Sequence, residues 1–179
     1  MIHSSGQTSR GFTSSCLENR GNVLTFQHAH GRFNYRTVAV VVHEQRVLLH
    51  RCEHDAFWAL PGGRVEFGEP AATALMRELQ EEMGVVGQVE RLLWIVENFY
   101  EYEEYSCHEL ALYFLVSFPH NAELYTQDAP FAGQEDDLQL IFQWFPVDQL
   151  EQLELYPTFL RQRLRALPST AEHVVHCDP

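Results

Sequence analysis

The most regular alternation of hydrophobic and polar positions lies between residues 71 and 83. Apolar side chains recur there every three or four residues, so at about 100° per residue they share one helical stripe. The stripe consists of Ala72, Leu75, Met76, Leu79 and Met83. Pro70 precedes this segment and Gly84 follows it, and such residues are common at the start and just past the end of a helix. The pattern predicts an amphipathic helix over 71–83.

Other apolar segments have the character of strands. The β-branched run from Thr37 to His43 predicts a central strand that is buried on both faces. A hairpin is expected to pair 23–27 with 32–35. Further strands are expected at 46–51, 89–102, 107–118 and 138–145, with an edge strand at 173–177. Residues 119–137 have the composition of a long loop, which in a compact domain tends to be functional. Pro157 predicts the start of a last helix, over 158–167.

Length and composition limit the domain organisation. The chain has 179 residues, 45% of them hydrophobic and 12% aromatic, which suits one globular domain with a substantial core. We expect residues 22–179 to form that domain. Residues 1–21 are rich in Ser, Thr and Gly and show no periodicity, so we expect a flexible leader, although an organelle-targeting role stays open. The sequence has no apolar run of the roughly 18 residues that a membrane span needs, and its first twenty residues have no secretory signal.

Charge and cysteine usage restrict the partners and the compartment. The net charge is −13, and all twelve cationic side chains are arginines. Such an acidic chain is not expected to bind polymeric nucleic acid, which requires a basic surface. A small phosphorylated substrate is compatible with it, because a metal ion can supply the positive charge. Four scattered cysteines without a CxxC pair predict free thiols and a cytoplasmic location. They are Cys16, Cys52, Cys107 and Cys177.

Three glutamates lie beside the apolar stripe of the predicted helix. Glu78 and Glu82 are about 40° apart on the helical wheel, and Glu81 lies about 60° to their other side. Like charges this close raise one another's pKa values unless something stabilises them. A hard divalent cation would do so, since Mg²⁺ prefers oxygen ligands and commonly shares its coordination with substrate phosphates. A solvated acidic face is the alternative, but the lysine partners typical of such a face are missing. Spacing alone leaves both interpretations open.

The residues around this helix form a longer ordered series. Gly63 is followed after five residues by Glu69, and after seven more by Arg77-Glu78-Leu79. Glu81-Glu82, Gly84 and Val85 complete the series. This stretch resembles the complete signature box of the Nudix hydrolases. The approach Trp58-x-Leu60-Pro61-Gly62-Gly63 resembles the same family, and a looser resemblance extends from about Arg36 to Leu167.

The resemblance implies a fold and an activity. The implied fold class is α/β (α+β), a Nudix-type α/β/α sandwich with a mixed central sheet. The implied activity is hydrolysis of a diphosphate linkage in a nucleoside diphosphate joined to another group, with Mg²⁺ or Mn²⁺ as cofactor. ADP-ribose-like compounds, nucleoside triphosphates and dinucleoside polyphosphates all stay open as small-molecule nucleotide substrates, because specificity depends on the loops around the site. A homodimer is compatible with the family. The alternative is a noncatalytic Nudix-fold nucleotide sensor or scaffold, a class that typically loses the box carboxylates that this chain retains.

The same resemblance assigns expected roles within the box. Metal ligands would be the three carboxylates Glu78, Glu81 and Glu82, together with the carbonyl of Gly62. Arg77 would hold a box carboxylate in place, and Glu69 would steady the loop. The glycines would serve backbone geometry, for which freedom at positive φ is the physical reason. They are Gly63, Gly68 and Gly84.

Residues outside the box complete the list of candidates. The general base that activates water stays open between Glu78, Glu109 and Glu135, the last of which lies in the long loop. Alternation along 107–118 places Glu109 on a face with apolar residues, so this carboxylate needs a partner. Arg51 and Trp58, just upstream of the box, are candidates for substrate binding. A surface role is the alternative for Arg51.

Overall fold

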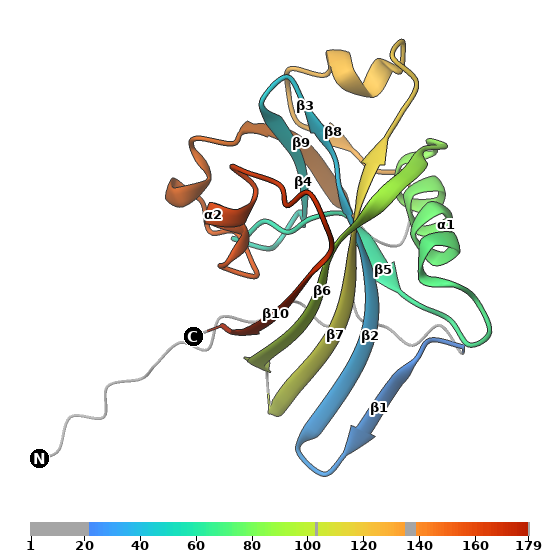
Figure 1. The fold of residues 1–179 in the computed structure, drawn as a ribbon, viewed down its shortest axis with the longest axis vertical. Coiled ribbons are helices and arrows are strands. Elements are labelled where there is room, and N and C mark those ends of the chain that lie inside the picture. Colours follow the sequence, from blue (N-terminus) through green and yellow to red (C-terminus); the bar gives the residue numbers. More distant parts are fainter. Residues whose placement is uncertain (1–21, 103, 135–138, 179) are drawn as a thin grey trace, which may run out of the picture.

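A computed structural model describes residues 22–102, 104–134 and 139–178, and among them two β-sheets are packed between helices (Figure 1). The larger sheet contains β1 (Thr25–His28), β2 (Gly31–Val40), β5 (Gly62–Arg64), β6 (Gln88–Tyr102), β7 (Tyr105–Ser117) and β10 (Glu172–Cys177). The smaller sheet contains β3 (Val42–His43), β4 (Arg46–Cys52), β8 (Phe131–Ala132) and β9 (Leu140–Pro146). The helices are α1 (Ala71–Met83) and α2 (Leu160–Arg163), with 3₁₀ turns at Glu123–Thr126 and Leu150–Gln152. The leader expected at 1–21 and the candidate base Glu135 lie outside the described residues.

The larger sheet is mixed, as the sequence predicted. Its strand order is β1-β2-β7-β6-β10, and β5 also pairs with β2. β7 is parallel to β2 and antiparallel to β6, while β10 is parallel to β6. The edge-strand prediction for 173–177 is therefore confirmed, as are the hairpin of β1 and β2 and the long strands expected near 89–102 and 107–118.

The β-branched run at 37–43 joins the two sheets instead of forming one strand. β2 ends at Val40 in the larger sheet, and β3 begins at Val42 in the smaller one. The expectation of burial on both faces is confirmed, because Ala39 and Val41 belong to one core cluster and Val38 and Val40 to the other. Hydrophobic pattern specifies burial but not the partner strand, which is why the sequence did not reveal this change of sheet.

The two core clusters lie on opposite sides of the sheets, and each lies beneath one helix (Figure 1). Leu75 and Leu79 of α1 are fully buried in the first cluster, and Leu160 and Leu164 in and after α2 are buried in the second. Burial of one such leucine side chain contributes roughly 1.5–3 kcal/mol. The boundaries of α1 are those that the sequence predicted. The molecule is thus the α/β/α sandwich with a mixed sheet expected from the sequence.

Two segments differ from the prediction. The last helix is limited to Leu160–Arg163, because the residues around it tighten into i→i−3 turns such as Arg165 N–H to the Gln162 carbonyl. Residues 119–134 are not structureless, since they contain a 3₁₀ turn and β8. The indole of Trp144 donates a hydrogen bond of 2.9 Å to the Leu124 carbonyl, and Tyr125 stacks on His43, so this connection is anchored to the core.

The state of the cysteines differs in part from the prediction, and the described helices are short. Cys52 is disulfide-bonded, so the prediction of four free thiols is wrong at this position, because spacing in sequence does not restrict pairing in space. Cys107 and Cys177 are free, as expected. The longest of the described helices, α1, has thirteen residues, and none of them combines the length and apolar character that crossing a membrane requires.

Candidate active site

The box begins where β5 pairs with β2. Gly62 has a φ of 141°, and a Cβ at this position would lie 2.9 Å from the Cα of Val38 and closer still to the Thr37 carbonyl oxygen. Only glycine fits such a backbone. A Cβ on Gly63 would lie within 2.5 Å of the Oε1 atom of Glu78. The absence of side chains at these two positions therefore lets the loop lie directly against the Glu78 carboxylate.

Arg77 gathers three box carboxylates around one guanidinium group. Its Nη2 lies 2.8 Å from Oε1 of Glu69, and its Nη1 lies 2.8 Å from Oε1 of Glu78 and 3.3 Å from Oε2 of Glu81. Nη2 also donates to the carbonyl of Arg64 at 3.4 Å. Glu69 in turn accepts a hydrogen bond of 2.8 Å from the backbone N–H of Glu66, which ties the loop to the same cluster. The family resemblance implied that Arg77 holds one box carboxylate, whereas the structure brings three to it.

The electrostatic environment separates the pKa values of these carboxylates. The hydrogen bond from Arg77 lowers the pKa of Glu69. Burial is the largest influence on Glu78 and raises its pKa, although Arg77 acts in the opposite direction. The neighbouring charge of Glu81 raises the pKa of Glu78 further. Glu78 thus holds a proton more readily than an ordinary glutamate does, and any bound cation would have to compete with that proton.

The C-terminal end of α1 lies against the residues that lead into β9. Glu82 is only 4% exposed, and its carbonyl accepts a hydrogen bond of 2.7 Å from the backbone N–H of Gln134. Gly84 adopts a left-handed φ of 68° and ends the helix, as predicted. A Cβ on Gly84 would lie 2.7 Å from Nε2 of Gln134, so the Gln134 side chain covers this turn. The residue immediately before Glu135 is therefore fixed to the box helix.

The donor atoms of the site fit a hard divalent cation. Glu78 and Glu81 both direct carboxylate oxygens to the same Nη1 atom of Arg77, and the Gly62–Gly63 backbone lies beside Glu78. Oxygen donors of this kind suit Mg²⁺ or Mn²⁺. Within the described residues, no three His, Cys, Asp or Glu side chains already surround one point as a metal cluster would. A cation would thus require Arg77 to release part of its hold on Glu78 and Glu81.

Arg36 is a component of the site that sequence analysis did not identify. It lies on β2, and its Nη2 donates a hydrogen bond of 3.2 Å to the carbonyl of Gly62. Its Nη1 lies 3.8 Å from Oε2 of Glu109 on β7. Burial, the largest influence, raises the pKa of Glu109, and Arg36 opposes it. The expectation that Glu109 needs a partner was the signal that could have led to Arg36.

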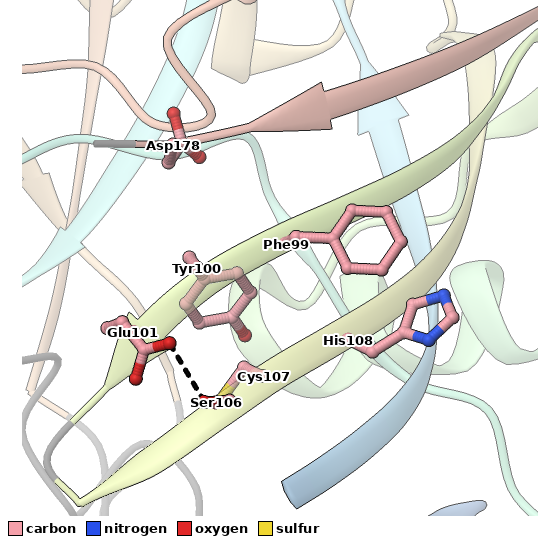
Figure 2. A pocket seen from close by; sticks show the side chains of 7 residues that line it. All are labelled: Phe99, Tyr100, Glu101, Ser106, Cys107, His108 and Asp178. Atoms are coloured by element: carbon pink, nitrogen blue, oxygen red, sulfur yellow. Dashed lines mark hydrogen bonds between the residues drawn. The ribbon is translucent and has the colours of Figure 1, made fainter.

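Beyond Glu109, the same face of the sheet leads to a cavity of about 320 Å³ at the end of the β6–β7 hairpin (Figure 2). Tyr100, Cys107 and Asp178 are part of its lining. Glu101 and Ser106, joined by a hydrogen bond of 2.8 Å, close the hairpin end. Asp178 accepts hydrogen bonds from the backbone and hydroxyl of Thr158. Phe99 and His108 also line the cavity, so its wall combines aromatic and polar side chains.

The other two sequence candidates for substrate binding lie next to each other, Arg51 on β4 and Trp58 in the connection between β4 and the box. Nη1 of Arg51 donates to the carbonyls of Cys52, Glu53 and Asp55, at 3.4, 2.9 and 2.8 Å. Its guanidinium carbon lies 5.2 Å from the centre of the Trp58 ring. Trp58 packs edge-on against Phe145, with ring centres 4.7 Å apart. Both side chains therefore have structural partners, and their role in substrate binding stays a prediction.

Comparison with known proteins gives a consistent family match. The NUDIX domain family model matches residues 33–167. An ADP-ribose pyrophosphatase of Methanocaldococcus jannaschii is 36% identical over 62 residues, which are 33% of this chain and 37% of that protein. The YjhB protein of Bacillus subtilis, whose name assigns it provisionally to the same activity, is 38% identical over 58 residues, or 32% of this chain and 28% of that one. The match thus spans about a third of the length of these curated relatives.

Solved structures extend the likeness over most of the chain. The crystal structure of a MutT protein from Bacillus halodurans has a TM-score of 0.58 at 21% identity and covers 82% of this chain and 91% of that one. A MutT protein from Methanosarcina mazei Go1 has a TM-score of 0.57 at 18% identity, with coverages of 77% and 94%. At these identities the likeness concerns the fold, and it agrees with the sandwich described above.

Proposed function

This chain belongs to the NUDIX family, and we propose that it is a metal-dependent pyrophosphohydrolase that cleaves a diphosphate linkage in a nucleoside-diphosphate-linked compound. The observation that carries the proposal is the cluster of Glu69, Glu78 and Glu81 around Arg77, with Glu82 buried on the same helix. On a solvated acidic helix face the carboxylates would be exposed, whereas Glu82 is buried and the side chains of Glu69 and Glu78 are only 18% and 15% exposed. We further propose that residues 22–179 act as one domain, since the family match over 33–167 includes strands of both sheets, and β1 and β10 pair with strands inside it.

The box residues have distinct proposed roles. Glu78, Glu81 and Glu82 would hold Mg²⁺ or Mn²⁺ together with the carbonyl of Gly62. When bound, such an ion neutralises charge on the diphosphate and acidifies a water molecule. Arg77 keeps the carboxylates of Glu78 and Glu81 close together before the ion arrives, and it would release part of that hold when the ion binds.

Proton transfer requires a carboxylate that accepts a proton from the attacking water. The oxygen of that water forms a bond to phosphorus, the bridging P–O bond breaks, and the products are a nucleoside monophosphate and a phosphorylated second half. Glu135 is the leading candidate for the base, and it follows Gln134, whose backbone is bonded to the Glu82 carbonyl. Glu78 is the next candidate, because burial raises its pKa toward the range that suits a general base. Glu109 is the third, but it is buried and forms an ion pair of 3.8 Å with Arg36.

The choice of first substrate rests on the relatives. ADP-ribose comes first, because the relative from Methanocaldococcus jannaschii is named an ADP-ribose pyrophosphatase. The MutT proteins share the fold, and a nucleoside triphosphate is therefore the second compound to test. A cytoplasmic location and a homodimer stay predictions, and the disulfide at Cys52 removes one of the four thiols on which the first of these was based.

The test is a panel of diphosphate compounds incubated with the full chain and Mg²⁺ or Mn²⁺, with the products identified by mass. The panel contains ADP-ribose, a nucleoside triphosphate, a dinucleoside polyphosphate and a nucleotide sugar. Glu82→Gln should lower turnover at least a hundredfold without loss of the fold, and the exposed Glu151→Gln serves as the matched control. Near wild-type turnover of Glu82→Gln at saturating Mg²⁺ would contradict the assignment. Nucleotide binding without any phosphate release would favour the noncatalytic alternative.

Glu135→Gln tests the assignment of the base separately. If Glu135 accepts the proton, the variant should lose turnover far more than metal affinity, and the acidic limb of its pH–rate profile should shift. An unchanged profile would eliminate Glu135 and leave Glu78 as the first candidate.

A further inference from the structure

We propose that Arg36 is an anion-binding residue of this site and that its guanidinium takes a nonbridging oxygen of the substrate's diphosphate group. The inference deepens the proposed function, on which it rests for the identity of the anion. Arg36 lies outside the box, and its connection to the site is visible only in the folded chain.

The position of Arg36 is fixed by strand pairing on both sides. On one side, β2 pairs with β5 in the register Arg36↔Arg64, Thr37↔Gly63 and Val38↔Gly62. On the other side, β2 pairs with β7, with Asn34 opposite Glu109. Arg36 therefore stands between the box loop and β7, and its Nη2 reaches the Gly62 carbonyl at 3.2 Å. A group bound to the box and extending over this face of the sheet would pass Arg36.

The guanidinium of Arg36 has N–H donors that its described partners do not use. An arginine has five N–H donors. The distance of 3.8 Å between Nη1 and Oε2 of Glu109 is that of an ion pair, not of a good hydrogen bond. The Nε atom also makes no hydrogen bond within the described part of the chain, but it is buried, so the donors open to a ligand are those on Nη1 and Nη2. By contrast, Arg77 and Arg51 each donate to several described oxygens. Arg36 is thus the better placed of these arginines to accept a new anionic partner.

The difference in exposure between Arg36 and Glu109 indicates the side from which a ligand would bind. The Arg36 side chain is 23% exposed, whereas that of Glu109 is 8% exposed. Part of the Arg36 side chain therefore faces solvent while the carboxylate that pairs with it is buried, so a ligand can reach the guanidinium from the solvent side. Burial works against the charge of Arg36, but Glu109 and more distant anionic groups, including Glu78, outweigh it and raise the pKa of Arg36. The side chain is accordingly a permanent cation beside the box.

Two positive groups would share the Gly62 carbonyl if the proposed metal ion also binds there. Such groups repel one another unless an anion lies between them, and a diphosphate has oxygens for both. Metal and diphosphate should therefore bind cooperatively, and the cooperativity should depend on Arg36. Reciprocity of binding free energies makes this coupling measurable from either side.

The experiment measures binding and needs no turnover. The probe is methylenediphosphonate, which has no hydrolysable bridge, titrated calorimetrically into the full chain with Mn²⁺. Mn²⁺ alone is titrated in parallel and followed by its electron paramagnetic resonance signal. Arg36→Gln should weaken diphosphonate binding ten- to a hundredfold, the loss expected for a charge-assisted hydrogen bond, and leave the affinity for Mn²⁺ alone within threefold. The matched control is Arg46→Gln, since Arg46 is 25% exposed and pairs with Asp128. This control should bind both probes as the wild type does.

Two further variants guard against a folding defect. Arg36→Gln leaves the buried Glu109 without its charged partner, which is costly. The double variant Arg36→Gln/Glu109→Gln removes that charge, and Arg36→Lys keeps a cation but loses the planar fork. Both should keep the fold, judged by circular dichroism. The double variant should bind diphosphonate as weakly as Arg36→Gln, and Arg36→Lys should be intermediate.

The outcomes separate this inference from the proposed function. If the folded Arg36 variants bind diphosphonate as tightly as the wild type, the inference is overturned even when the enzyme turns over its substrate. Equal loss of affinity for Mn²⁺ alone would also overturn it, because Arg36 would then only position the Gly62 carbonyl. If no compound of the panel is hydrolysed but diphosphonate binding depends on Arg36, the anion site stands and the proposed reaction fails.

Discussion

Gly63→Ala is the most direct test of the contact between the box loop and Glu78. A Cβ at position 63 would lie within 2.5 Å of Oε1 of Glu78 and nearer to its Cδ. Real Cβ contacts stay above 3.0 Å, so the carboxylate would have to retreat by more than about 0.5 Å. Gly63 has no positive φ, so alanine fits its backbone without strain. The substitution therefore displaces one carboxylate and leaves the strand intact.

The expected changes in kcat and in the free energy of unfolding follow from the contacts that this displacement breaks. The pair between Glu78 and Arg77 is partly exposed, and pairs of that kind contribute about 0.2–1 kcal/mol to stability. Misplacement of a reacting group by about 1 Å can cost a hundredfold in rate. Gly63→Ala should therefore lower kcat between tenfold and a hundredfold, about 1.4–2.7 kcal/mol in activation free energy, while unfolding changes by less than about 1 kcal/mol.

The assay combines kcat at saturating Mg²⁺ with urea unfolding and an Mn²⁺ titration. Gly31→Ala is the matched control, because the nearest atom to its new Cβ is the His28 carbonyl oxygen at 3.4 Å, an ordinary contact. We expect the control to match the wild type in all three measurements. Wild-type kcat and Mn²⁺ affinity in Gly63→Ala would refute the reasoning, since the orientation of Glu78 would then be irrelevant to the site.

Three further outcomes follow from the same contacts. Arg77→Gln should reduce kcat more than tenfold and lower the melting temperature, because Glu69, Glu78 and Glu81 then repel one another. Activity assays and thermal unfolding measure the two effects, and an unaltered kcat would contradict the prediction. Gly62→Ala should lower the free energy of unfolding by about 2–4 kcal/mol, because alanine would combine a positive φ with a backbone clash. Urea unfolding measures this, and a change smaller than about 1 kcal/mol would argue against the clash. Burial and then Arg36 lower the pKa of His50 from 6.5 to about 3. Because the pKa of His50 is depressed in the folded state, the stability advantage of the wild type over His50→Gln is complete above pH 6.5. It should shrink by up to about 1.4 kcal/mol per pH unit as the pH falls toward 3. Parallel urea titrations of the two proteins would measure this, and a difference that does not change with pH would contradict it.

The sequence predicted what is encoded locally. Helix α1 was expected over 71–83 and is found there, because its apolar stripe and the glycine at 84 lie within one short segment. The box was read from fixed spacings of the same kind. The shortening of the last helix to Leu160–Arg163 could not be read in this way, since the competition between i→i−3 and i→i−4 hydrogen bonds is decided by packing.

Contacts between residues far apart in the chain could not be predicted from a single sequence. Glu109 needed a partner on simple grounds of burial, but nothing in the chain indicated that the partner was Arg36, which reaches it through the pairing of β2 with β7. The same limit applies to the β-branched run at 37–43, whose residues are buried as expected but divided between two sheets. Alternation specifies which face a side chain occupies and leaves the neighbouring strand undetermined.

The two arginines at the box resolve the conflict between an acidic chain and an anionic substrate. The net charge of −13 is spread over the whole molecule and is screened beyond about 8 Å at physiological ionic strength. Within that distance the local arrangement decides, and the roles of Arg77 and Arg36 differ there. Arg77 already contacts three carboxylates, so its charge is largely compensated by them. Arg36 faces one carboxylate at 3.8 Å and one carbonyl, so its charge is less compensated, and we propose that it meets the substrate. An acidic protein can thus bind a diphosphate if the cations that meet it are few, local and incompletely neutralised.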